Sequence, residues 1–119
     1  MNEGTRRTAN DILALYAQGE RYFFEIDIDN EDFRDTDLAG ARFENCWVGC
    51  VDFSHAKLAG VSFSNCNVKS SNFTGADLRN AEFDGSAIEG ILIEGAKIEG
   101  VTFEGATSYG GIFRNGETP

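Results

Sequence analysis

Three cysteines and the only histidine lie between positions 46 and 66, and these side chains are the first candidates for chemistry. Cys46, Cys50, His55 and Cys66 carry the thiol and imidazole groups that bind zinc in proteins. A structural zinc site needs four convergent ligands, usually with shorter spacings between its cysteines. We therefore expect no metal and no cofactor here, and we interpret Cys46 and Cys66 as small buried apolar residues.

The sequence shows neither a nucleophile placed beside a base nor a pair of acidic residues placed to act together. The repeat described below places no serine or cysteine beside His55, although a nucleophile and its base must lie within hydrogen-bond reach. It also sends four evenly spaced glutamates to different sides of the molecule, so that no two share a site. These residues are Glu89, Glu94, Glu99 and Glu104. We expect no catalytic residue and no enzymatic activity.

The composition restricts the remaining classes of function. A chain of 119 residues is one domain by length. Its formal net charge of −10 argues against direct contact with nucleic acid or with an anionic membrane, because both require a basic surface. No apolar run is long enough to span a membrane, and the polar beginning "MNEGTRRTAND" is unlike a secretory signal. We expect a cytoplasmic protein.

The elements that position these side chains follow a period of five residues, which fits neither a helix nor a strand. Every fifth residue from Phe33 to Phe103 is a large hydrophobe, and a mostly small or β-branched residue stands two positions before it. Such persistent self-similarity indicates a repeat architecture. We expect the large residues to form a stacked core, and they are Phe33, Leu38, Phe43, Val48, Phe53, Leu58, Phe63, Val68, Phe73, Leu78, Phe83, Ile88, Ile93, Ile98 and Phe103.

From Gly40 onward, glycine or asparagine follows each core position by two residues, except at Cys50, His55 and Ser70. Both residue types tolerate the positive φ of a type II turn, so we expect one turn in each repeat, and another turn type is open at Cys50 and His55. The core residues themselves repeat every twenty positions, as Phe-Leu-Phe-Val or Phe-Leu-Phe-Ile. Four sides of five residues then complete one coil, and residues twenty apart stack at the parallel-strand spacing of about 4.8 Å. The pattern predicts an all-β solenoid.

The stretches "GADLRNAEF", "TDLAGARF" and "GAKIEGVTF" resemble the pentapeptide-repeat family, whose units follow the pattern A-[DN]-[LF]-x-x. The resemblance covers roughly residues 31 to 115 and departs from the pattern at Ser108, where the central hydrophobe is missing. It implies a right-handed quadrilateral β-helix that serves as a non-enzymatic scaffold or protein-interaction module. Some members of the family bind type II topoisomerases such as gyrase and protect them from quinolones, presenting an acidic rod in place of DNA. The charge of −10 suits this alternative, whereas a coil stack of only about 22 Å does not.

A solenoid needs both ends covered, because an open coil exposes its core and its unpaired strand edge. We expect residues 1–20 to supply a capping helix, with Thr8 as its N-cap, Asp11 three residues later and Gly19 as its stop. Residues 21–115 are expected to form the repeat domain, and residues 116–119 a C-terminal tail.

At the C-terminal end, no helix-length segment follows the repeats, and Leu92, Tyr109 and Ile112 hold outward positions. They are expected to form an apolar patch, where either two subunits meet as a homodimer or the tail folds over its own last coil. Trp47 also holds an outward position and is a candidate anchor for an unknown protein partner. We favour the alternative that Trp47 packs beneath the N-terminal segment, because single surface aromatics are common.

Overall fold

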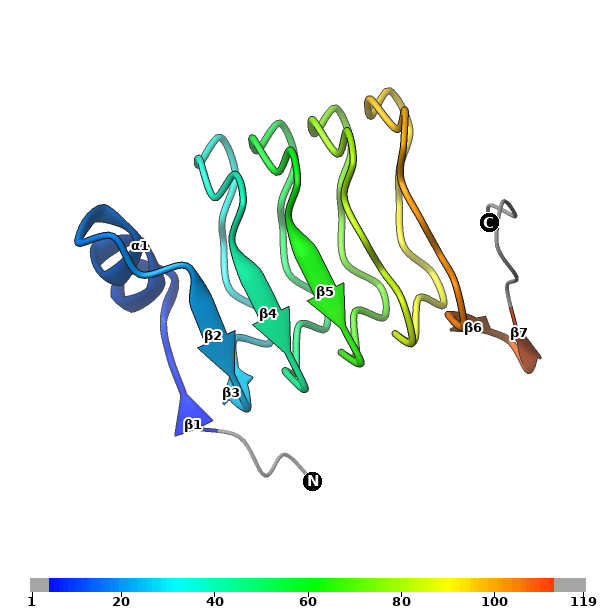
Figure 1. Cartoon of the computed structure of the whole chain (residues 1–119), viewed down its shortest axis with the longest axis horizontal. Helices are drawn as coiled ribbons and strands as arrows, with labels where there is room; N and C mark the ends of the chain where they lie inside the picture. The colour runs from blue at the N-terminus through cyan, green and yellow to red at the C-terminus, as the bar shows by residue number, and fades with distance from the viewer. Residues whose placement is uncertain (1–4, 113–119) are drawn as a thin grey trace.

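The computed structural model of the chain describes residues 5–112, so the expected tail at 116–119 and the expected end of the repeat domain at 115 lie outside the described residues. The elements in chain order are β1 (Thr5–Arg6), α1 (Ala9–Ala17), β2 (Tyr22–Phe24), β3 (Ile26–Asp27), β4 (Arg42–Glu44), β5 (Ser62–Ser64), β6 (Thr107–Ser108) and β7 (Gly111–Ile112). Between β3 and β6 the chain winds through successive coils that lie side by side along the longest axis of the molecule (Figure 1).

Helix α1 lies at the N-terminal end of the coils (Figure 1). It begins with a capping box, in which the Thr8 hydroxyl accepts the Asp11 N–H at 3.1 Å and the Asp11 carboxylate accepts the Thr8 N–H at 3.0 Å. Gly19 follows the helix with a φ of +101°, a conformation that ends helices and favours glycine. Ile12 is fully buried in the same core cluster as the coils. No helix in residues 5–112 is long and apolar enough to cross a membrane.

The corners of the coils are set by the backbone. A residue with positive φ recurs every five positions from Glu25 to Gly110, including the non-glycine residues Cys50, His55 and Ser70. At the His55 corner the Ala56 N–H donates to the Phe53 carbonyl at 3.0 Å, as expected for a type II turn. Four such corners complete one lap of twenty residues.

Hydrogen bonds between residues about twenty apart join each coil to the next. The Phe33 N–H donates to the Asp52 carbonyl at 2.7 Å, and the Asp52 N–H donates back to the Glu31 carbonyl at 3.1 Å. Most of these contacts are isolated parallel bridges. Among the described residues, one three-stranded parallel sheet forms from β2, β4 and β5. In its register, Phe23 lies opposite Phe43, and Phe43 lies opposite Phe63. The sheets are open rather than closed, and the architecture is a β-solenoid.

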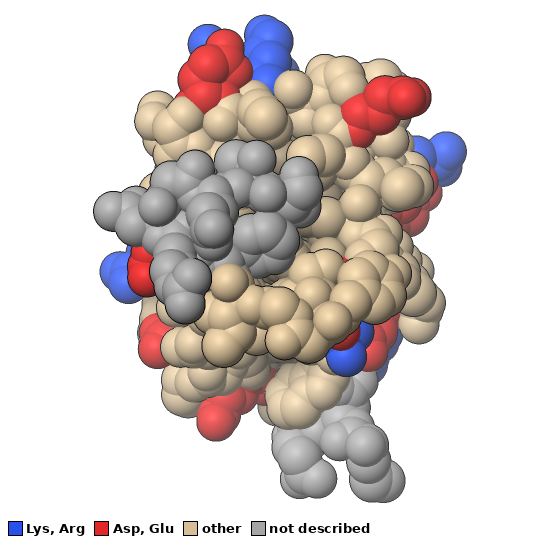
Figure 2. All heavy atoms as spheres, turned by 90° about the vertical axis from the view of Figure 1, so that its right-hand side faces the viewer, with Lys and Arg blue, Asp and Glu red and all other residues tan. Residues whose placement is uncertain are grey.

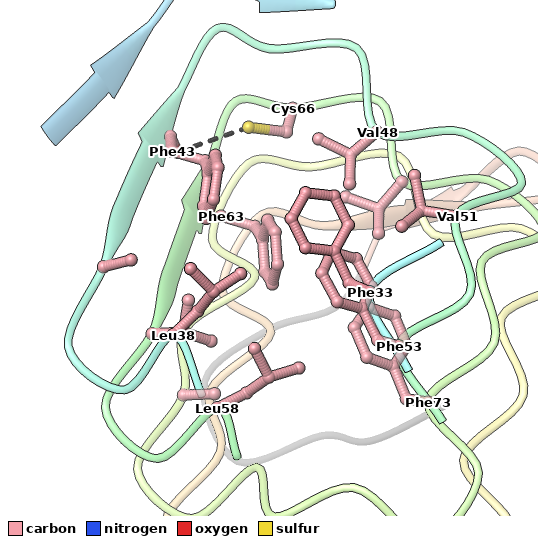
Figure 3. Packing of buried hydrophobic residues seen from close by; sticks show 14 of the residues in the cluster. Phe33, Leu38, Phe43, Val48, Val51, Phe53, Leu58, Phe63, Cys66 and Phe73 are labelled. Atoms are coloured by element: carbon pink, nitrogen blue, oxygen red, sulfur yellow. Dashed lines mark hydrogen bonds between the residues drawn. The ribbon is translucent and has the colours of Figure 1, made fainter. Parts of the chain in front are cut away.

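Four columns of large side chains fill the interior, one behind each side of the coil (Figure 3). They are the Phe23 column (Phe23, Phe43, Phe63, Phe83, Phe103), the Ile28 column (Ile28, Val48, Val68, Ile88), the Phe33 column (Phe33, Phe53, Phe73, Ile93) and the Leu38 column (Leu38, Leu58, Leu78, Ile98). The phenylalanine rings within a column stack at centroid distances of 5.1 to 5.4 Å. Rings of neighbouring columns meet edge to face, as Phe53 and Phe63 do at 5.7 Å.

The last coil departs from the expected core. Ile93 is only partly buried and Ile98 is 40% exposed, although Leu78, directly before Ile98 in its column, is 1% exposed. In these two columns no described residue follows Ile93 or Ile98, because the next positions, 113 and 118, lie outside residues 5–112. The spacing identifies the inward direction of Ile98 but not whether anything covers it.

The C-terminal end also departs from the five-residue register. That register places Ile112 beside Leu92, but Ile112 pairs with Thr107 in the antiparallel hairpin formed by β6 and β7. Tyr109 and Gly110, at the tip, have φ values of +50° and +85°, which is the pattern of a type I′ hairpin turn. Ser108 has no apolar side chain to bury at its core position. The chain therefore loses little hydrophobic stabilisation when it reverses direction here instead of continuing the coil.

The stacked core predicts a large difference between an inward and an outward substitution. Phe63 is fully buried and touches four other phenylalanine rings, so Phe63→Ala should lower the free energy of unfolding by about 3–5 kcal/mol. Lys57 is exposed, and Lys57→Ala should cost about 0.5 kcal/mol or less. Urea unfolding followed by circular dichroism measures both values, and equal losses would contradict the assigned inward register.

Candidate functional site

The cysteines and the histidine do not converge. Cys46 and Cys66 are buried in adjacent coils, with the Cys46 N–H donating to Cys66 Sγ at 3.5 Å, whereas Cys50 and His55 are exposed at separate corners. The neighbouring Cys46 thiol and then burial raise the pKa of the Cys66 thiol, which favours its protonated form. Within residues 5–112, no three His, Cys, Asp or Glu side chains are grouped so as to hold a metal ion.

Buried thiols and hydroxyls serve a structural role at particular corners. The Ser86 hydroxyl donates to the Phe63 carbonyl at 2.7 Å and accepts the Cys66 N–H at 2.9 Å, one coil earlier. These are the two backbone groups that a type II turn would pair with each other. Ser71 bridges the corner at Cys50 in the same way, through the Val48 carbonyl and the Val51 N–H.

The sequence alone does not reveal this arrangement, because serine and cysteine at these positions also satisfy the expectation of a small residue. The Cys66 thiol repeats the pattern, since it donates to the Phe43 carbonyl at 3.3 Å and approaches the Cys46 N–H. A usable signal is a serine or cysteine 21 residues after a corner residue that is not glycine, as Ser71 is after Cys50 and Ser86 is after Asn65. The open question of turn type is therefore settled differently at Cys50, which needs Ser71, and at His55, which does not.

The four evenly spaced glutamates lie at the surface in different surroundings. Glu94, Glu99 and Glu104 are exposed, while Glu89 pairs with Lys69 at 3.6 Å. Each occupies a different side of the coil. The stack of alternating charges on the side of the Leu38 column is a feature that sequence reasoning missed, and it consists of Asp37, Lys57, Asp77 and Lys97, joined by backbone bridges. Such neighbouring opposite charges favour the observed register.

Arg79 pairs within its own side, whereas Arg34 contacts Asp32 on its own side at 2.8 Å and also Asp52 in the next coil at 3.7 Å. Arg79 contacts Asp77 at 2.6 Å, although its position favours Glu99 in the next coil. Residues two apart point outward from the same side, which leaves the shorter reach to Asp77. The hydrogen bond from Arg79 lowers the pKa of Asp77 to about 2. Arg114, which stands twenty residues after Glu94 in the sequence, lies outside the described residues.

The candidate interaction residues lie on different parts of the surface. Leu92, Tyr109 and Ile112 are 54%, 83% and 67% exposed at the C-terminal end of the coils. Figure 2 views this end, and among the described side chains visible there most are uncharged, with the charged ones mainly at the rim. Trp47 is half-buried, with its backbone bridged to Asp27 and Asn67 on the two neighbouring coils. It is therefore a weaker candidate for an exposed anchor than the three residues at the end.

Sequence reasoning missed a second exposed apolar pair, near the N-terminal end. Tyr22 and Phe24 lie on the outer face of β2, are 45% and 46% exposed, and stack at 6.0 Å. The Tyr22 hydroxyl donates to Glu44 at 2.8 Å, and the Arg42 guanidinium lies 5.8 Å from the Tyr22 ring. Three consecutive aromatics in a strand are a signal for this, because only the middle one, Phe23, can face the core.

Comparison with known proteins agrees with the repeat geometry. The family profile described as "Pentapeptide repeat region" matches residues 22–93, and the chain belongs to this family. A pentapeptide-repeat protein from Nostoc PCC 7120 is 20% identical, with a TM-score of 0.74, over 81% of this chain and 78% of that one. One from the cyanobacterium Cyanothece 51142 is 22% identical, with a TM-score of 0.64, over 67% of this chain and 54% of the other.

A third similar structure is QnrB1, a plasmid-mediated fluoroquinolone resistance protein. It is 21% identical, with a TM-score of 0.63, over 71% of this chain and 47% of its own. The chain thus spans about half the length of QnrB1 and of the Cyanothece protein. Identities this low establish a shared fold alone. No curated protein matched the sequence.

The bridging role of Ser86 predicts a graded response to substitution. Ser86→Ala leaves the buried Cys66 N–H and Phe63 carbonyl unpaired and should cost about 1–3 kcal/mol of unfolding free energy. Ser86→Cys should cost less, because Cys66 performs the same role one coil earlier. Ser62→Ala, at a partly exposed outward position, is the control. Chemical denaturation compares the three, and an Ala variant as stable as the Cys variant would contradict this role.

The Asp77–Arg79 pair predicts an acid-dependent loss of stability. The folded-state pKa of Asp77, about 2, lies below the ordinary value of 3.8, so its contribution is present above pH 3.8 and disappears as the pH falls toward 2. Asp77→Asn should therefore show a shallower fall in unfolding free energy between pH 4 and pH 2 than the wild type. Glu94→Gln, which removes a carboxylate without an ion pair among the described residues, is the control. Parallel curves for the wild type and Asp77→Asn would refute the coupling.

Proposed function

We propose that the chain is a non-enzymatic structural module that binds another protein through its surface. The observation that supports this most directly is the continuous buried core, whose columns run from Phe23 to Phe103 and leave the reactive side chains on separate sides. A scaffold fixed by hydrogen bonds between coils holds its outward side chains at regular spacings. Such a surface suits binding, because little ordering entropy is lost when rigid partners associate.

The binding surface that we favour is the C-terminal end, with Leu92, Tyr109 and Ile112, followed by the side that carries Trp47. Exposed apolar side chains within a charged surface are typical of interaction sites. The partner is a protein, a second copy of this chain included, rather than nucleic acid or a membrane, because the formal charge is −10. No cofactor is required for this function.

The second candidate is an acidic mimic of DNA that binds gyrase or another type II topoisomerase. It is supported by the net charge of −10 and by the structural similarity to a fluoroquinolone resistance protein. The short coil stack and the 47% coverage of QnrB1 weigh against it. We therefore rank it below a module with another protein partner.

The handedness of the coils, the role of α1 and the cellular location are part of the same proposal. We take the coils to wind in the right-handed sense of a quadrilateral β-helix, with α1 as the cap of the first coil. The burial of Ile12 in the shared core supports this role for the helix. The cytoplasm is the proposed location.

Affinity capture from the native lysate tests the binding surface. The wild type should retain a partner, and the variant Trp47→Ala, Leu92→Ser, Ile112→Ser should retain it at least about tenfold less, since buried apolar anchors dominate such interfaces. The control Arg34→Ala, Lys57→Ala, Glu104→Ala changes three exposed charged residues and should behave as the wild type. Equal retention by all three proteins would exclude this surface.

Gyrase assays separate the two candidates. A micromolar excess of the chain should leave supercoiling and its inhibition by a quinolone unchanged if the partner is another protein. A clear change in either measurement would favour the DNA-mimic function instead.

A further inference from the structure

The side of the solenoid that lies over the Leu38 column carries charges that alternate from coil to coil. Asp37, Lys57, Asp77 and Lys97 hold equivalent outward positions in four successive coils, and a backbone bridge joins each to the next. We call these four residues the charged strip. The coils follow the longest axis of the molecule (Figure 1), and at about 4.8 Å per coil the strip is about 14 Å long.

Most of the strip is not neutralised within the chain. Lys57 and Lys97 are exposed, and neither forms an ion pair among residues 5–112. Asp37 is exposed as well, and its carboxylate accepts the Ala39 N–H at 3.0 Å, which holds it close to its own strand. Of the four residues, Asp77 has an ion pair in this part of the chain, with Arg79. The other three charges are available to a group outside the chain.

The net charge of this side differs from that of the other three. Its described outward residues include three acidic and three basic side chains, namely the strip together with Arg79 and Glu99. On each of the other sides, acidic side chains outnumber basic ones among the described residues. The side of the Phe23 column, for example, carries Arg42 and the acidic residues Glu44, Glu82, Asp84 and Glu104. Because the chain has a formal charge of −10, a second copy meets the least repulsion at the charged strip.

The order of the charges makes the strip complementary to itself in one orientation. Along the solenoid it reads negative, positive, negative, positive from Asp37 to Lys97. An antiparallel copy presents the reverse order, so Asp37 faces Lys97 of the second copy and Lys57 faces its Asp77. Every position then meets an opposite charge, whereas a parallel copy in the same register meets four like charges.

The second row of outward residues on this side fits the same orientation. The row consists of Ala39, Ala59, Arg79 and Glu99 in successive coils. In the antiparallel arrangement, Arg79 lies opposite Ala59 of the second copy, and Glu99 lies opposite its Ala39. Each long side chain therefore meets a short one, so the two faces approach closely without a clash.

We propose that two copies of the chain bind each other antiparallel through their charged strips. A twofold axis along the strand direction relates the copies, so the same surface is used by both and the contact gives a closed dimer. The inference goes beyond the proposed function, because it concerns a side of the solenoid that does not include Leu92, Tyr109 or Ile112.

The contact is weak and depends on salt. Exposed ion pairs contribute little individually, and the strip is too short to bury the roughly 1,200 Å² of total surface at which specific stable interfaces begin. At about 0.1 M salt, charges more than about 10 Å apart are largely screened, which reduces the repulsion between the acidic sides but preserves the attraction between strips in contact. At about 1 M salt the screening length is about 3 Å, and the contact should be lost.

Sedimentation equilibrium with the full chain tests this dependence. At about 500 µM chain and about 0.1 M salt, the average mass should rise above the chain mass of 13.0 kDa toward twice that value, and at about 1 M salt it should return to the single mass. A wild type of single mass in both solutions would overturn the proposal. A mass that exceeds two chains, or a dimer that persists in the high salt, would overturn it as well.

Two variants of equal composition separate the order of the charges from their number. Asp77→Lys, Lys97→Asp opposes like charges at all four positions of the antiparallel contact and should have the single mass at every concentration. Lys57→Asp, Asp77→Lys keeps opposite charges at all four positions and should still dimerise. Both variants retain the formal charge of −10 and both lose the Asp77–Arg79 pair, so each is the control for the other.

Equal behaviour of the two variants contradicts the proposal. If both dimerise, the copies meet on another surface, and if neither does, the loss follows from the change at Asp77 rather than from the order of the charges. Circular dichroism checks that the variants are folded, and where one is not, the salt dependence of the wild type decides.

The proposed function is tested separately. The two variants leave Leu92, Tyr109 and Ile112 unchanged, so the failure of the dimer leaves the capture result standing. A contact this weak is dissociated at the chain concentrations of a lysate, so the substitution at Lys57 in the capture control does not affect that experiment.

Discussion

Each side of the solenoid ends in a residue with positive φ, and this conformation recurs every five positions from Glu25 to Gly110. The regular corner makes one lap equal to twenty residues, so each side meets its equivalent in the next coil. Backbone bonds such as Phe33 N–H to the Asp52 carbonyl then form along the whole stack. The columns of buried side chains depend on the same register, because a shift of one residue would turn Phe53 and Phe63 toward solvent.

Several corners depend on the coil that follows them. Where a corner lacks the usual turn hydrogen bond, a side chain in the next coil replaces it, as Ser71 does for the corner at Cys50 and Ser86 does for the corner at Asn65. Local structure in one coil is therefore stabilised by tertiary contact with the next. This explains how exposed non-glycine residues such as Cys50 are held with positive φ, a conformation that costs them more than glycine.

The asymmetry of the ends connects the fold to the proposed function. A stack of identical units must stop somewhere, and each stop leaves apolar surface and backbone groups without a neighbouring coil. At the first coil, α1 buries Ile12 in the shared core, and Glu31 accepts the Ala9 N–H while it pairs with Arg6. At the last coil, Ser108 interrupts the pattern, the chain reverses through the hairpin at Tyr109, and Leu92 and Ile98 are exposed.

The sequence by itself determined the period, the inward positions, the corners and the beginning of α1, because these depend on residue types at short fixed spacings. The outward direction of Tyr22 and Phe24 was also predictable from the sequence, because successive residues of a strand face opposite sides and Phe23 faces the core. Only the tertiary structure decided that Ile98 is exposed, that Ile112 pairs with Thr107, and that Ser86 bridges a corner in the preceding coil. These features depend on contacts between one coil and the next. The spacing of residues along the chain specifies the direction of each side chain, but it does not specify which residue of another coil lies against that side chain.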